Sequence, residues 1–203
     1  MDRCLSKGSD FISKNRLEAF SDGVFAIIIT IMVLDLKIPA GSGWSELIKP
    51  RFVNTLLAYL LSFLFVVSFW ISHHTIITPV QIVDKTLLWF NVVLLSAISL
   101  LPLVTAWHGE YPNSVAPSFS YLFIYVLSVF CLYLLGVVAT KRVKSENREF
   151  FQRTNKIRLC LVLSGIFASF LTLIYPLIAS FSVFAILLFW LVFSSWQENI
   201  SKV

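Results

Sequence analysis

The sequence predicts an all-α membrane protein with six transmembrane helices, and three observations lead to this prediction. Hydrophobic residues make up 58% of the 203 residues and charged residues only 13%, unlike the composition of an ordinary soluble domain. The mean hydropathy of +0.84 is typical of a polytopic membrane protein. The apolar residues also gather into stretches of about 20, the length that crosses a hydrocarbon core of roughly 30 Å.

We expect a single domain, 1–203, with spans at about 17–37, 52–73, 86–107, 118–139, 158–175 and 178–196. The last two spans share one uncharged run between Arg158 and Glu198, which is too long for one helix. The break is expected at Tyr175-Pro176, because proline disfavours helix in the residue before it. Residues 1–15 are polar, so we expect no secretory signal before the first span.

The distribution of basic residues predicts that both termini are cytoplasmic. Of the 16 lysines and arginines, all but Lys37, Lys49 and Arg51 fall on the N-terminal side of the membrane, and an excess of basic residues marks cytoplasmic loops. Residues 141–158 are expected to form a basic loop that sets this topology and attracts anionic lipid, with a regulatory lipid or protein site as the alternative. We expect a multi-pass protein of the cell (plasma) membrane that binds no nucleic acid.

The first span carries the most informative pattern. Charged residues precede an uncharged run from Gly23 to Leu34, and ionisable groups at the mouth of a membrane helix are costly enough to mark functional candidates. At about 100° per residue, one face of this helix is almost purely apolar and the other is polar at one end. The apolar face holds Arg16, Phe20, Gly23, Ile27, Ile31 and Leu34, with Thr30 at its edge, and the polar face holds Glu18, Ser21 and Asp22.

The same span contains the pattern Arg16-x-x-x-Phe20-Ser21-Asp22, followed by Ala26-Ile27-x-x-Thr30 and Leu34. This pattern resembles the signature first helix of the endosomal and lysosomal potassium-channel family (transmembrane protein 175 type) and its bacterial relatives. Trp70-x-x-His73-His74 and Asn91 match that family more loosely. The resemblance implies a homotetramer in which the first helices of four subunits line a central pore. Ile27 would form its narrowest hydrophobic constriction, with Ile31 and Leu34 on the same wall.

The polar residues near the cytoplasmic end are expected to hold and orient the pore helix without contacting ions. A charged group inside a bundle needs partners, and the members of this structural network would be Arg16, Phe20, Ser21, Asp22, Trp70, His73, His74 and Asn91. The alternative is a simple interfacial anchor, in which Arg16 snorkels and Asp22 caps the helix.

The predicted function is a potassium-permeable cation channel that conducts passively. Isoleucine at the narrowest ring would block ions by dewetting, and Thr30 offers a pore-lining hydroxyl for a partly dehydrated cation. The chain has no Thr-Val-Gly-Tyr-Gly filter, so selectivity for potassium over sodium is expected to be weak. The alternatives are a proton-conducting pore and a secondary transporter of small cations, although no internal repeat typical of transporters is evident. For an unrecognised helix, the apolar stripe would be read as facing lipid or the core.

We expect no enzymatic activity, cofactor or metal site. The sequence offers no evident pairing of a nucleophile with a base. His73, His74 and His108 lack the spacing of a metal-ligand set, and three scattered cysteines imply no disulfide framework. His108 is expected at the outer membrane surface, and a histidine at the inner pore entrance could give sensitivity to pH near neutrality. The expected partners are potassium and other monovalent cations, membrane lipid and further copies of the chain.

Overall fold

The computed structural model describes residues 13–200, with side chains as far as Trp190. The polar segment 1–12 therefore lies outside the described residues. Within them the chain is helical and has no strand. The elements are α1 (Lys14–Leu34), the short 3-10 helix η1 (Trp44–Ile48), α2 (Pro50–Ile77), α3 (Lys85–Ile98), α4 (Leu101–Glu110), α5 (Val115–Thr140), α6 (Ser145–Leu171) and α7 (Ile178–Ile200).

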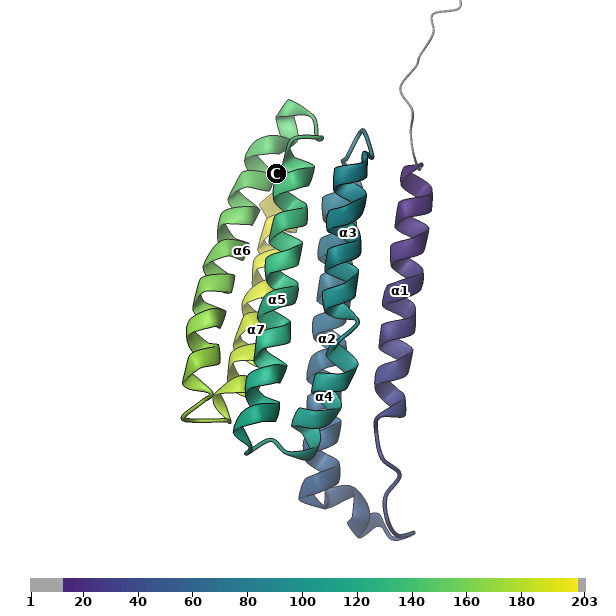
Figure 1. The fold of residues 1–203 in the computed structure, drawn as a ribbon, viewed down its shortest axis with the longest axis vertical. Helices are drawn as coiled ribbons and strands as arrows, with labels where there is room; N and C mark the ends of the chain where they lie inside the picture. The colour runs from purple at the N-terminus through teal and green to yellow at the C-terminus, as the bar shows by residue number, and fades with distance from the viewer. Residues whose placement is uncertain (1–12, 201–203) are drawn as a thin grey trace, which may run out of the picture.

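The helices run up and down along one axis, with α3 and α4 in tandem (Figure 1). Helix α5 occupies the centre and packs against α2, α3, α4, α6 and α7. Helix α1 lies at one edge of the bundle, where it packs against α2, α3 and α4. This placement covers one side of α1 and leaves the other side without a neighbour in the single chain.

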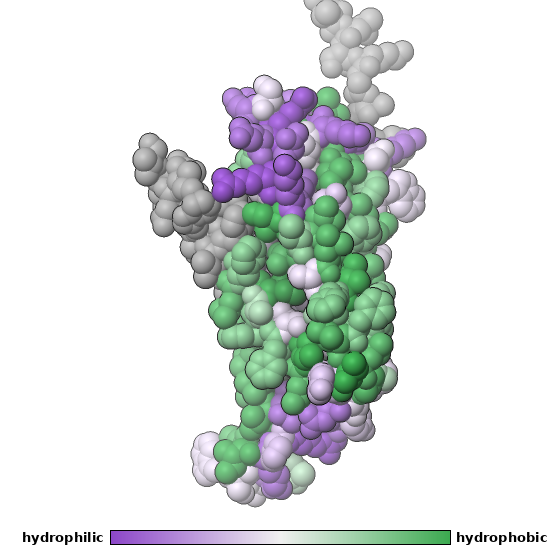
Figure 2. All heavy atoms as spheres, turned by 90° about the vertical axis from the view of Figure 1, so that its left-hand side faces the viewer, coloured by the Kyte–Doolittle hydropathy of each residue, from purple (hydrophilic) through white to green (hydrophobic). Residues whose placement is uncertain are grey.

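Five helical segments among the described residues are long and apolar enough to cross a membrane: Lys14–Leu34, Pro50–Ile77, Lys85–Glu110, Val115–Thr140 and Ser145–Leu171. A shorter apolar stretch, Ile178–Trp190, belongs to α7. Figure 2 shows a wide apolar belt between two hydrophilic ends. The chain is therefore a multi-pass membrane protein.

The third expected span, 86–107, is interrupted. Helix α3 ends at Ile98 and α4 begins at Leu101. Proline at position 102 explains the break, because it has no N–H for the carbonyl of Ile98 and its ring crowds that carbonyl. At the end of α3, the hydroxyl of Ser99 donates to the carbonyl of Ser96 at 2.8 Å.

The prediction of a basic loop over residues 141–158 is wrong, because α6 begins at Ser145. The connection from α5 is therefore short, and the basic segment forms the first turns of α6. Its helical character comes from one face that packs on the end of α5, formed by the buried residues Phe151, Thr154, Asn155 and Arg158. Asn155 Nδ2 also donates to Thr140 Oγ1 at 3.3 Å.

His108 lies in the last turn of α4, where its side chain is buried in the bundle. Its Nε2 lies 2.7 Å from the hydroxyl of Ser180 on α7, and its Nδ1 lies 3.2 Å from that of Ser118 on α5. The ring stacks on Tyr121 with centroids 4.5 Å apart. The Tyr121 hydroxyl is in turn 3.1 Å from Ser62 on α2. Hydrogen bonds between helices therefore hold together the half of the bundle that contains α4, as is common where water is absent.

An ion pair joins two connections at the opposite end. Arg142, after α5, binds Asp84, before α3, in a two-pronged contact with Nε–Oδ1 at 3.0 Å and Nη2–Oδ2 at 2.5 Å. Asp84 also caps α3 by accepting the backbone N–H of Leu87 at 2.9 Å. The hydrogen bonds from Arg142 lower the pKa of Asp84 below its ordinary value of 3.8.

This pair predicts a loss of stability in acid. A lowered pKa in the folded state means that the stabilisation is complete above pH about 4 and disappears as the pH falls through the lowered value. The melting temperature of D84N, measured in detergent from pH 7 to pH 3, should therefore be lower near neutrality and fall less toward acid than that of the unmodified protein. The control variant E146Q changes an exposed carboxylate near the same end and should keep the unmodified profile. Parallel profiles for D84N and the unmodified protein would contradict the prediction.

Candidate functional site

Helix α1 has two different faces. Leu17, Ser21, Phe25, Ile28 and Met32 are buried against the neighbouring helices. A second stripe, about 110° around the helix from the buried face at 100° per residue, is exposed in the single chain, with Ile27 58% and Leu34 79% accessible. We call the residues Phe20, Ile27, Ile31 and Leu34 the exposed stripe of α1. The helix is uninterrupted from Lys14 to Leu34, so the backbone carbonyls of Phe20 and Ile27 are engaged within the helix, and at these positions only side chains are available.

Three buried polar side chains join α1 to α2 and α3. The hydroxyl of Ser21 donates to the carbonyl of Leu17 at 2.9 Å and accepts from Nδ2 of Asn91 at 3.0 Å. The amide oxygen of Asn91 lies 2.7 Å from Nε2 of His73. Because an amide oxygen only accepts, His73 donates from Nε2 in this arrangement. The chain of hydrogen bonds sets the rotation of α1 about its own axis.

Asp22 makes a second link from α1 to α2. Its Oδ1 accepts the indole N–H of Trp70 at 2.8 Å. The Trp70 ring stacks on His74 with centroids 6.3 Å apart, and Nε2 of His74 lies 3.4 Å from the hydroxyl of Thr78. We call Ser21, Asp22, Trp70, His73 and Asn91 the anchoring network, because each member is hydrogen-bonded to another helix.

Arg16 and Phe20 lie outside the anchoring network. Both are exposed in the single chain, and the side chain of Arg16 forms no ion pair or hydrogen bond with the side chains of residues 13–190. They line an open cavity between α1 and α3, together with Lys85, Trp89 and Asn91. Arg16 and Phe20 are thus on the same helix as Ser21 and Asp22 of the anchoring network, but they face the open cavity between α1 and α3.

Sequence reasoning missed a further contact at the start of α1. The ammonium group of Lys14 donates to the backbone carbonyl of Thr78 at the end of α2. Lys14 also lies 3.9 Å from the carboxylate of Glu18, and the spacing of four residues was the available signal for this ion pair. No pattern in the sequence indicates the carbonyl of Thr78 as a partner.

Thr30 lies beside the exposed stripe with its hydroxyl proton engaged. Oγ1 is 2.9 Å from the carbonyl of Ile27 and 3.0 Å from that of Ala26, and it donates into its own helix. A hydroxyl oxygen keeps acceptor capacity when its proton is donated. The side of Thr30 that faces away from the bundle can therefore accept from water or coordinate a cation.

A second open cavity borders the exposed stripe nearer the C-terminal end of α1. It lies between α1 and the break that separates α3 from α4, and is lined by Val24, Ile27, Ile28, Ile31, Asp35, Ser99, Pro102 and Leu103. Apolar hollows on both sides of α1 are typical of a surface that another molecule covers. Among the described residues, no cluster of three or more histidine, cysteine, aspartate or glutamate side chains could hold a metal ion.

Comparisons with known proteins agree with this geometry. A family model described as "Endosomal/lysosomal potassium channel TMEM175" matches residues 16–102. A protein of Chryseobacterium sp. (strain P1-3), named as a potassium channel, is 38% identical over 188 residues, which are 89% of this chain and 94% of that protein. TMEM175 of Danio rerio, named as an endosomal/lysosomal proton channel, is 34% identical over 119 residues, which are 52% of this chain and 22% of the longer relative.

A solved structure supports the same conclusion. The crystal structure of a homolog, from Chamaesiphon minutus, of the lysosomal potassium-selective channel TMEM175 matches with a TM-score of 0.74 at 26% identity, covering 89% of this chain and 97% of that chain. The multi-pass helical fold and the matched first helices thus define an ion channel. The chain belongs to the TMEM175 family, which is a family of ion channels and not of enzymes.

The link between Asp22 and Trp70 predicts a coupled loss of stability. D22A removes the acceptor and W70F removes the donor, and each variant should lower the melting temperature by about 2–4 °C, as expected for about 1 kcal/mol in a chain of this size. The double variant D22A/W70F should lose little more than either single variant. D22N is the matched control, because it removes the charge and keeps an acceptor oxygen. Additive losses would show that the two side chains act separately.

Proposed function

We propose that this chain is a subunit of a homotetrameric, potassium-permeable cation channel whose central pore is lined by α1. Each subunit would be one domain with six membrane spans, α3 and α4 together forming the third and α7 the sixth. Both termini would be cytoplasmic in a cell membrane, in agreement with the basic residues near that end. Ions would move passively down their electrochemical gradient.

The observation that carries this proposal is the exposed stripe of α1. Its apolar residues have no cover in the single chain, while another face of the same helix is anchored by hydrogen bonds to α2 and α3. One helix cannot enclose a pore, so several copies must meet around an axis, and cyclic symmetry is the usual arrangement. The cavities on the flanks of α1 would then be covered by neighbouring subunits.

Ile27, Ile31 and Leu34 would form the hydrophobic constriction of this pore. Rings of apolar side chains at a narrow point impede ions by dewetting. Thr30, one turn from Ile27, would supply an acceptor oxygen for a partly dehydrated cation. Because α1 is a continuous helix, its backbone carbonyls cannot form a selectivity filter, and discrimination between potassium and sodium should be weak.

A proton-conducting pore is the second candidate. The relative from Danio rerio is named as a proton channel, and a constriction that dehydrates metal ions can still pass protons along a chain of water molecules. His74 is exposed beside Trp70 in this chain, and an imidazole ring can donate and accept hydrogen bonds within a chain of water molecules.

The test is the current through the purified protein in planar bilayers, with potassium on one side and sodium on the other at equal pH. The proposal expects a steady current whose reversal potential is displaced modestly toward potassium. A current that follows an imposed pH gradient and ignores the metal cations would favour the proton pore. No current without a second substrate would favour a transporter.

The constriction makes a specific prediction. I27N places an amide on the narrowest ring, so that the constriction wets more readily, and single-channel conductance should rise several-fold. V33N introduces the same side chain on α1 at an exposed position about 120° away from Ile27 and should leave the conductance unchanged. Equal conductance of I27N and the unmodified protein, with expression preserved, would place Ile27 off the pore.

A further inference from the structure

Arg158 brings a positive charge into the interior of the bundle. This side chain of α6 is only 3% exposed. It packs against α5 at Gly136, where an added Cβ would stand 2.9 Å from Nη1. Arginine keeps its proton in proteins, and a buried charge is costly unless it is balanced.

The described residues balance this charge only in part. Nη1 donates to the amide oxygen of Asn155 at 2.9 Å, and the guanidinium carbon lies 5.5 Å from the ring centroid of Trp190, a cation–π contact. Nε is buried without a hydrogen-bond partner. No aspartate or glutamate among side chains 13–190 forms an ion pair with Arg158. One donor and the net charge are therefore left without a partner in this part of the chain.

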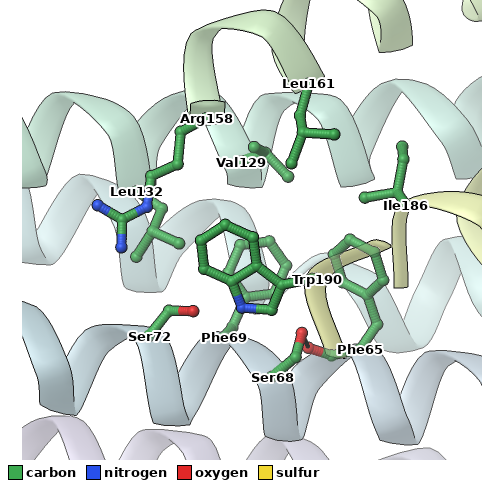
Figure 3. A pocket seen from close by; sticks show the side chains of 10 residues that line it. All are labelled: Phe65, Ser68, Phe69, Ser72, Val129, Leu132, Arg158, Leu161, Ile186 and Trp190. Atoms are coloured by element: carbon green, nitrogen blue, oxygen red, sulfur yellow. Dashed lines mark hydrogen bonds between the residues drawn. The ribbon is translucent and has the colours of Figure 1, made fainter. Parts of the chain in front are cut away.

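A small cavity opens beside the guanidinium, between α2, α5, α6 and α7 (Figure 3). Its volume is about 20 Å³, whereas one bound water needs roughly 10–15 Å³. The cavity therefore suits a single atom-sized occupant and is too small for a phosphate group or a lipid headgroup. Most of its lining is apolar, which strengthens electrostatic attraction by the one charge beside it.

Two hydroxyl groups of α2 face the same cavity. Ser68 donates its proton to the carbonyl of Phe65 at 2.7 Å, whereas Ser72 is buried and forms none of the hydrogen bonds among the described side chains. Figure 3 shows the hydroxyl of Ser72 and the guanidinium of Arg158 on the same side of the cavity, one from α2 and the other from α6. Two available donors thus point to an acceptor that carries negative charge.

We propose that this cavity binds a monatomic anion of the halide class, held by the guanidinium of Arg158 and the hydroxyl of Ser72. The anion neutralises the buried charge and joins α2 to α6. Ser72 is followed on α2 by His73, which is bonded to Asn91 in the anchoring network. An occupied site therefore also stabilises the segment of α2 that holds α1.

The test compares the purified full-length chain in chloride, bromide and gluconate salts of potassium at equal ionic strength. Chloride and bromide should raise the melting temperature by about 2–4 °C relative to gluconate, and the rise should saturate with halide concentration. Crystals grown in bromide should give an anomalous scattering peak between Arg158 and Ser72. Neither measurement uses ion conduction, so the result is independent of the proposed channel function.

Variants identify the residues that bind. R158M keeps a long side chain without the charge and should lose the halide-dependent increase in melting temperature. S72A should raise by several-fold the bromide concentration that gives half of the maximal increase. K156Q is the matched control, because it removes one positive charge from an exposed position on the same helix and should keep the full rise. If R158M fails to fold, the anomalous peak of bromide in the unmodified protein and the bromide dependence of the S72A melting temperature still test the proposal.

Other occupants predict different results. Equal melting temperatures in all three salts without a bromide peak would show that the cavity holds only water, and would overturn the proposal. A halide effect that appears only in E198Q would show that a carboxylate of this chain fills the role of the anion; the side chain of Glu198 lies outside the described residues. Stabilisation by anionic lipid in the absence of a bromide peak would assign Arg158 to a headgroup instead.

Discussion

The structure depends on one constraint, which is that the polar side chains of α1 must be satisfied by neighbouring helices. In the membrane interior water is not available, and an unpaired polar group is expensive. Ser21 therefore requires Asn91, and Asn91 in turn binds His73, so that three helices meet around one buried chain of hydrogen bonds. A rotation of α1 about its axis by about 100°, the angle between successive residues, would break this chain of hydrogen bonds. The anchoring network thus determines which side of α1 faces away from the bundle.

The consequence is an asymmetric helix at the edge of the subunit. Its anchored face is buried, and its exposed stripe and adjoining hollows present apolar surface with no cover in one chain. Such a surface is unstable in isolation unless lipid or another subunit covers it. A ring of identical subunits would cover the flanks of α1 and direct the stripe toward the axis, which is the arrangement that the proposed channel requires.

Away from α1, the bundle is also stabilised by polar contacts in an apolar interior. His108 joins α4, α5 and α7 in one half of the bundle, and Arg158 lies against α5 and α7 in the half that carries the basic residues. Helices in a membrane gain little from apolar association, because lipid is equally apolar. Hydrogen bonds and close contacts such as that at Gly136 therefore determine which helices are neighbours. Ser72 and His73 place α2 between the Arg158 cavity and the anchoring network.

The sequence by itself determined the membrane class, the approximate spans, the apolar stripe of α1 and the family, since these follow from local hydropathy, from a period of 3.6 residues and from a motif within one helix. It also predicted Trp70, His73 and Asn91 as neighbours of α1. Only the tertiary structure decided that Trp70 binds Asp22 and that Asn91 binds Ser21, because these partners are 48 and 70 residues apart and their contact depends on how the helices pack. The same reason applies to α6, whose polar first turns carry no hydropathy signal and become helical against α5. Arg158, which in the sequence is one more basic residue of a supposed loop, is buried by that packing.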